Sequence, residues 1–63
     1  MIRLKYQKEE VIAHVVFNED FEDVYVEKAV FAETGEYLED HECEYLRNYN
    51  LNYLKVLHAE LYS

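Results

Sequence analysis

The chain opens with an alternation of apolar and polar residues that is typical of a β-strand. Ile2, Leu4 and Tyr6 alternate with polar neighbours, so one side of this segment is apolar and the other is polar. A polar break of hairpin length follows at residues 8–10, and residues 11–17 then form a run that is apolar on both faces apart from one histidine. Such a run predicts a central strand that is covered on both sides, or covered on one side with its other face used at an interface.

A third strand is predicted from Val24 to Ala32. We expect one face to carry Val24, Val26, Val30 and Ala32, interrupted by Lys28, and the other to carry Tyr25, Glu27, Ala29, Phe31 and Glu33. Thr34-Gly35 is the clearest turn signal, because glycine accepts a positive φ without steric cost. The next residues, Tyr37 and Leu38, either add a short fourth strand or lead into a helix.

The last third of the chain has the apolar spacing of a helix. Asp40 is the predicted N-cap, and the acidic residues just after it suit the helix dipole. Apolar residues then recur at helical spacing, namely Leu46, Tyr49, Tyr53, Leu54, Leu57 and Leu61. Because asparagines near Asn50 weaken helix propensity, the segment is either one long helix or two helices broken there. The sequence therefore predicts an α+β fold in a single domain over residues 1–63: a small antiparallel sheet of three or four strands, followed by a C-terminal helix packed on one face.

Length and cysteine usage limit how such a fold is stabilised and where it works. A domain of 63 residues has a marginal core and often needs a partner subunit or other support, so a homodimer is one expectation. The single cysteine, Cys43, allows no intrachain disulfide and fits a reduced cytosol. There is no apolar run of about 18 residues that would suggest a membrane span, and the charged first residues do not resemble a signal peptide. We expect a cytoplasmic protein.

The charge is concentrated in the middle of the chain. The net charge is −8, yet residues 1–17 balance to +1, residues 18–44 to −10 and residues 45–63 to +1. With six basic residues against fourteen acidic ones, direct nucleic-acid binding through a basic patch is not expected. The apolar fraction of 51% is too high for a disordered acidic tail, so the acidic segment belongs to a folded protein.

Catalytic and metal-binding arrangements find little support. The spacing of His41 and Cys43 does not make them face each other, and neighbouring acids would raise a thiol pKa, so Cys43 is better explained as a small apolar residue on the inner helix face. Residues 18–23 lack the glycine and the distal glutamate of a calcium loop, and His41-x-Cys43 alone offers too few ligands for zinc. A phosphate-binding loop needs several glycines, and this chain has one. A chain of 63 residues can also hardly enclose a pocket in which catalysis would take place. We expect neither an enzyme nor a cofactor or metal.

The acidic middle instead suggests a surface that binds another protein. Carboxylates two residues apart on a strand lie roughly 6–7 Å from each other, a spacing similar to that of nucleic-acid phosphates. Such a surface would attract a partner with a basic surface. The alternative is that the acids only keep a small apolar protein dissolved. The candidate binding residues are Glu19, Asp20, Glu22, Asp23, Tyr25, Glu27, Glu33, Glu36, Tyr37, Glu39 and Asp40.

The tyrosines and leucines leave two further alternatives open. Tyr45, Tyr49 and Tyr53 form one helical stripe, which serves either a binding surface or the core with hydroxyls at its rim. Leu51, Leu54, His58 and Leu61 fit a short a/d seam that could join two copies into a structural homo-oligomer.

In its size, its acidic middle from Asn18 to Glu44 and its aromatic richness, the chain resembles small acidic accessory proteins of bacteriophages and mobile elements. Some of these inhibit host restriction, CRISPR or nucleic-acid enzymes by mimicking DNA or by covering an active surface. The resemblance lies in general character and carries over no individual residue. It implies an inhibitor or regulator of a host nucleic-acid-binding protein.

Overall fold

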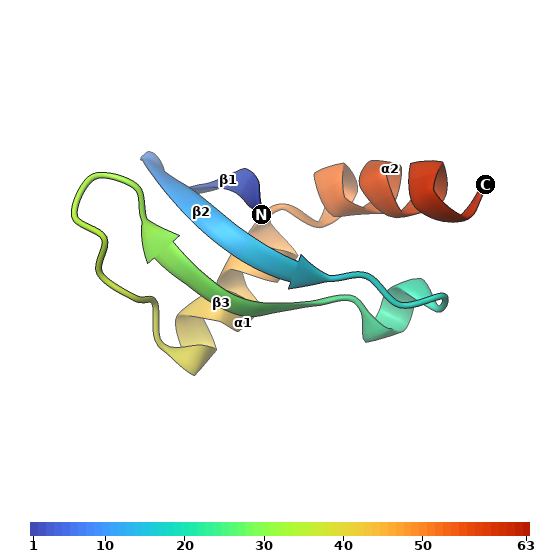
Figure 1. Cartoon of the computed structure of the whole chain (residues 1–63), viewed down its shortest axis with the longest axis horizontal. Coiled ribbons are helices and arrows are strands. Elements are labelled where there is room, and N and C mark those ends of the chain that lie inside the picture. Colours follow the sequence, from blue (N-terminus) through green and yellow to red (C-terminus); the bar gives the residue numbers. More distant parts are fainter.

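The computed structural model describes residues 1–63 and confirms the predicted α+β fold. Three antiparallel strands lie in the order β1-β2-β3, and two helices follow them along the chain (Figure 1). The elements are β1 (Ile2–Tyr6), β2 (Glu9–Val16), the 3₁₀ turn η1 (Phe21–Asp23), β3 (Tyr25–Phe31), α1 (Asp40–Tyr49) and α2 (Leu51–Tyr62).

The first hairpin is tighter than its sequence suggested. β1 ends at Tyr6 and β2 begins at Glu9, so Glu9 and Glu10 belong to the sheet and not to the connection. Gln7 takes the left-handed conformation, with a φ of 57°, that so short a turn requires. The prediction of a central strand is confirmed, since β2 pairs with β1 on one side and β3 on the other.

The face assignment for β3 was wrong beyond Val26. His14 pairs with Lys28 whereas Val15 pairs with Val26, so Glu27 is an extra residue that forms a β-bulge. A bulge reverses the alternation of side chains, and Ala29 therefore joins Val26 on the buried face while Val30 turns outward opposite Ile12. His14 and Lys28, which pair with each other next to the bulge, are both exposed.

The connection from β3 to α1 contains the predicted turn but no fourth strand. Gly35 has a φ of 76°, and its backbone N–H donates to the Phe31 carbonyl at 2.7 Å. Tyr37 forms only an isolated bridge with Val30. The predicted N-cap was one residue late, because α1 begins after Glu39, whose N–H donates to the Glu42 carboxylate at 3.0 Å. This bond satisfies a backbone donor ahead of the first turn, as in a capping box.

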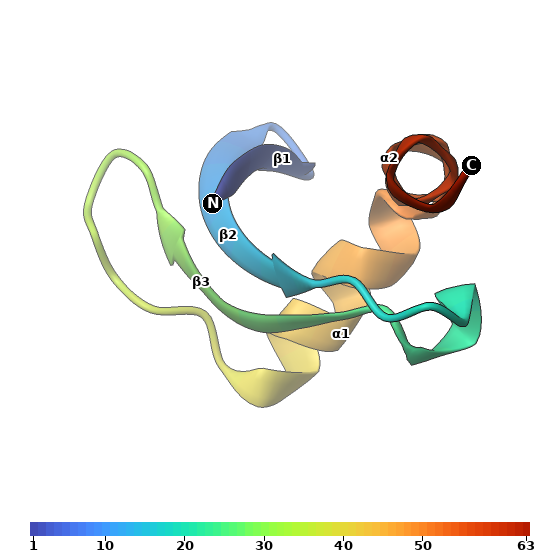
Figure 2. The same ribbon diagram turned by 45° about the vertical axis from the view of Figure 1, so that its right-hand side comes forward.

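The C-terminal segment forms two helices that meet at Asn50. The Asn50 side-chain amide donates to the carbonyl of Leu46 at 2.9 Å and to the carbonyl of Lys5 in β1 at 2.8 Å. The side chain thus ties the helix junction to the edge of the sheet, which explains a break at this residue. α1 crosses one face of the sheet, whereas α2 extends away along the molecule, beside η1 and toward the C-terminus (Figures 1 and 2).

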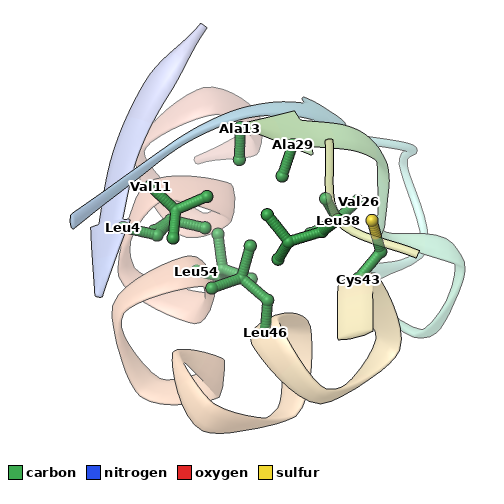
Figure 3. Packing of buried hydrophobic residues seen from close by; sticks show 9 residues of the cluster. All are labelled: Leu4, Val11, Ala13, Val26, Ala29, Leu38, Cys43, Leu46 and Leu54. Carbon is green, nitrogen blue, oxygen red and sulfur yellow. The ribbon is translucent and has the colours of Figure 1, made fainter. Parts of the chain in front are cut away.

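The core lies between the sheet and the helix junction. Leu46 of α1 and Leu54 of α2 are both fully buried and point toward Val11, Ala13 and Ala29 of the sheet (Figure 3). The other buried members of this cluster are Leu4, Val26, Leu38 and Cys43. Leu61, which continues the apolar spacing of the helix, is 62% exposed, because α2 runs past the end of the strands.

Candidate protein-binding surface

The structure divides the acidic middle of the chain between two separate surfaces. The first is a groove between the start of β3 and one side of α1, built from two adjoining hollows of about 500 and 320 Å³. Both hollows share Tyr25, Glu44 and Arg47 in their linings. We call this feature the β3–α1 groove; its polar and aromatic lining includes Glu22, Asp23, Tyr25, Asp40, Glu44 and Arg47.

Arg47 holds the two walls of the β3–α1 groove together. It projects from α1, and its Nε donates a hydrogen bond to the Val24 carbonyl on the opposite wall. Its guanidinium lies over the Phe21 ring, 5.5 Å from the centroid, and its Nη1 donates to the Asn48 side chain at 3.3 Å. The turn that carries Glu22 and Asp23 is therefore fixed to the helix that carries Glu44.

The groove carboxylates have no partner within the protein. The chain has two ion pairs, Arg3 with Glu10 at 2.7 Å and His41 with Glu39 at 3.6 Å, and both lie outside the groove. None of the carboxylates of Glu22, Asp23, Asp40 or Glu44 accepts a hydrogen bond from another residue. Four unpaired carboxylates thus line a groove whose walls are an α-helix and the start of a strand. Arg47 is the one basic residue in its lining, so the groove keeps an excess of negative charge that can accept cationic side chains.

The second acidic surface lies around the connection from β3 to α1. Glu33 and Glu36 of that connection line a hollow together with Glu9 and Glu10 of β2. We call these four residues the loop cluster. Its charge is partly balanced, because Lys8 lines the same hollow and Glu10 pairs with Arg3, which holds the Glu10 carboxyl pKa below its usual value. The loop cluster lies at the end of the molecule away from α2 (Figures 1 and 2).

The remaining candidate residues line neither of these surfaces. Asp20 accepts a hydrogen bond from the Glu22 backbone at 3.0 Å and so caps η1, and the Glu19 backbone carbonyl faces α2. Glu27 occupies the bulge, Tyr37 is 69% exposed on the connection, and Glu39 precedes α1. The structure therefore brings together Glu22, Asp23, Tyr25 and Asp40 from the candidate set, and Glu33 with Glu36 elsewhere.

Glu44 and Arg47 are groove residues that were not among the candidates from the sequence. Asp40, Glu44 and Arg47 are spaced i, i+4 and i+7, so they lie on one side of α1. This spacing was the available signal. The spacing was overlooked because the helix was expected to pack its residues into the core. The acidic residues were grouped by their position along the chain and not by the side of the helix on which they lie.

The alternative chemistry considered for the histidines and cysteine finds no shared site. Cys43 is buried in the core while His41 is exposed and adjoins Glu39, so the interpretation of Cys43 as an inner-face residue is confirmed. Burial raises the pKa of the Cys43 thiol, and the charges of Asp40 and Glu42 act in the same direction.

Internal hydrogen bonds already use some of the oxygens at two possible cation sites. In residues 18–23 the Asp23 carbonyl accepts from Asn18, the Asn18 and Glu19 carbonyls accept from His58, and the Asp20 carboxylate accepts from the Glu22 backbone, whereas the Glu22 and Asp23 carboxylates accept no hydrogen bond. Glu39, His41 and Glu42 lie close enough to share a cation, but they lie at the positive end of α1 and Glu42 already serves the cap.

Most of the tyrosines are about half exposed, so neither of the two uses expected for them, a binding surface or the rim of the core, accounts for all of them. Tyr25, Tyr45, Tyr49, Tyr53 and Tyr62 are all between 44% and 51% exposed. Tyr45 packs edge-on against Tyr6 with ring centroids 5.3 Å apart and also contacts Tyr49. Tyr25 is the tyrosine that lines the β3–α1 groove.

Comparison of the chain with protein families, with curated proteins and with solved structures finds no match. Neither α1 nor α2 has the length and apolar content that crossing a membrane would require.

Proposed function

We propose that this protein is a binding module that docks its β3–α1 groove onto the basic surface of another protein. The observation that carries this proposal is the set of unpaired carboxylates of Glu22, Asp23, Asp40 and Glu44 around one groove whose walls Arg47 connects. Ions on a rigid scaffold lose little conformational freedom when a partner binds, so their attraction to a cationic surface is used efficiently.

The partner that best fits this chemistry is a protein that uses its basic surface to bind nucleic acid. An array of carboxylates competes with phosphates for the same arginines and lysines. Docking of the groove would cover those side chains and inhibit or regulate the partner. Tyr25 adds an exposed aromatic side chain beside the carboxylates, which supplies contact area at small entropic cost. A cytoplasmic location remains a prediction that belongs with this proposal.

The test compares two triple variants that change the net charge equally. One carries Glu22→Gln, Asp23→Asn and Glu44→Gln in the groove, and the other carries Glu9→Gln, Glu33→Gln and Glu36→Gln at the other acidic surface. With an arginine-rich peptide as the probe, titration calorimetry should show the groove variant binding roughly tenfold or more weakly, at about 0.5–1 kcal/mol per lost charge contact. The second variant should lose less than about threefold.

Equal losses in the two variants would mean that bulk charge and not the groove attracts the probe, and would overturn the proposal. Binding of the wild-type protein should also weaken as salt is raised. A pull-down from cell extract with the wild-type protein and with the groove variant would identify the natural partner as a protein captured by the first and lost with the second.

A further inference from the structure

Helix α2 has more apolar surface than the fold uses. Leu54 is its only fully buried residue, whereas Tyr53, Val56 and Leu61 are 51%, 56% and 62% exposed. Apolar side chains thus occur around most of the circumference of α2. A helix of this kind is normally enclosed by other protein, since a surface helix keeps its apolar residues on one stripe.

The exposed apolar residues of α2 adjoin apolar residues at the end of the sheet. Leu57 and Leu61 line a hollow of about 340 Å³ with Ile2 of β1 and Phe17 after β2. Tyr53, one turn earlier on the same side of the helix, lines the next hollow along the β1 edge. We call this surface the α2 patch, made of Ile2, Phe17, Tyr53, Val56, Leu57 and Leu61. Val56 lines neither hollow and is included because it lies one turn before Glu60, which lines the hollow of Leu57 and Leu61.

The part of the α2 patch around Leu57 and Leu61 carries little charge in a strongly acidic protein, whereas the hollow beside Tyr53 is also lined by Arg3, Lys5 and Glu10. Glu60 is the only charged residue that lines the apolar hollow, and Lys55 points to the other side of α2, over the Phe21 ring at 5.8 Å. Two copies of a protein with a net charge of −8 repel each other, and they can approach most easily where the carboxylates are absent. A basic partner would be drawn to the β3–α1 groove instead.

We infer that the α2 patch is the surface through which two copies of this chain associate. In a two-fold arrangement the patch meets itself, so that Leu61 of one copy can enter the hollow formed by Ile2, Phe17 and Leu57 of the other. The seam expected from the sequence is not this surface, because Leu54 is buried in the core and His58 is bonded to the loop before η1.

The size of the protein supports a second copy as the occupant. A chain of 63 residues with a small core gains stability from association. Since a standard interface needs roughly 800 Å² from each partner and α2 is about 18 Å long, we expect the contact to belong at the small end of the class. The β3–α1 grooves of the two copies would both stay accessible, because no groove residue lines the patch.

Sedimentation equilibrium of the full chain at several concentrations and two salt levels tests this inference. The wild-type protein should show a monomer–dimer equilibrium that tightens as salt screens the repulsion between copies. Leu61→Asp and, as a second variant at an exposed position, Val56→Asp should be monomers with unchanged circular dichroism. Tyr37→Asp, which adds the same charge at an exposed site far from the patch, should associate like the wild-type protein.

Three results would overturn the inference. The first is a wild-type monomer at every concentration that stays in solution and at both salt levels. The second is association that survives in folded Leu61→Asp and Val56→Asp or is lost in Tyr37→Asp. The third is a dimer that weakens with salt, because that dependence marks a contact between opposite charges. The sedimentation result does not depend on the proposed role of the β3–α1 groove. Binding of a basic probe to the groove should weaken with salt, and it should persist in a monomeric variant.

Discussion

The two helices of this small protein are held in different ways. α1 buries Cys43 and Leu46 against the sheet and exposes its acidic side, so its apolar residues are largely used by the fold. α2 buries only Leu54 in the core, packs Leu57 against its margin, and is otherwise held by hydrogen bonds and ring contacts of Asn50, His58 and Tyr62. α1 therefore uses its apolar side within the fold, whereas the exposed apolar side of α2 is available to another molecule.

Polar contacts attach the C-terminal half of α2 to the loop before η1. His58 Nε2 donates to the carbonyls of Asn18 at 2.7 Å and Glu19 at 3.1 Å, and the Tyr62 hydroxyl donates to the Phe17 carbonyl at 3.0 Å. The His58 ring also packs between Phe21 and Tyr62. These contacts fix the direction of α2 while leaving Val56 and Leu61 exposed.

The largest expected effect comes from truncating Leu46, the fully buried leucine of α1. Leu46→Ala should lower the free energy of unfolding by about 2–5 kcal/mol, because it opens a cavity at a fully buried position. Leu57→Ala, at a half-buried position of α2, should cost only about 1 kcal/mol in the monomer. Urea unfolding of both variants in the Leu61→Asp background measures this difference without association. Equal losses would mean that α2 is as much a part of the core as α1.

Removing the attachment of α2 should have an intermediate effect. His58→Ala deletes two hydrogen bonds and two ring contacts, which predicts a loss of about 1–2 kcal/mol and faster amide exchange in α2 than in α1. The control is His14→Ala, which changes an exposed side chain on the sheet and should stay within about 0.5 kcal/mol of the wild-type value. Exchange that accelerates equally in both helices would contradict a separate attachment of α2.

Removing the cap at the start of α1 should lower the free energy of unfolding somewhat less than removing His58. Glu42→Ala removes the carboxylate that accepts the Glu39 N–H, and a lost cap of this kind costs about 1 kcal/mol. Glu44→Ala is the matched control, since it removes an exposed glutamate from the same helix whose carboxylate accepts no hydrogen bond. Thermal unfolding followed by circular dichroism compares the two, and an equal change in Tm would show that the cap does not stabilise α1.

The smallest effect concerns alkaline pH. Because burial raises the pKa of Cys43, the folded state favours the protonated thiol; its contribution to stability is full below the ordinary cysteine pKa of about 8.5 and is lost as pH rises through the higher folded value. The wild-type protein should therefore lose slightly more stability between about pH 8 and pH 9.5 than Cys43→Ala, as measured by urea unfolding. An identical pH dependence would mean that the thiol ionises as readily in the folded protein as in the unfolded one.

The parts of the fold that follow from local pattern were predictable. The alternation of apolar and polar residues predicted β1, and the apolar run that follows predicted β2. Asn50 indicated the helix junction, because an asparagine side chain competes for backbone groups, and here it donates to the Leu46 carbonyl. The faces of β3 were mispredicted because a single extra residue, Glu27, inverts the alternation. Two adjacent polar residues inside an apolar strand were the signal for that bulge.

The candidate binding surface was predicted in composition but not in shape. Proximity along the chain grouped Glu22 with Glu33, whereas the fold places them in different hollows and brings Glu44 to Glu22 across the groove. That pairing depends on the contact of Arg47 with the Val24 carbonyl, 23 residues away, which no local pattern encodes. The exposure of α2 was missed for a similar reason, because helical spacing does not show where the sheet ends.

The most direct test of the account is an NMR titration of the isotope-labelled protein with an arginine-rich peptide. The amide signals of Asp23, Tyr25 and Glu44 should shift first and most, with those of Glu33 and Gly35 in the loop connection and those of α2 changing little. Shifts of equal size at both acidic surfaces would contradict the central claim that the β3–α1 groove, and not the overall charge of the chain, is the site that recognises a basic partner.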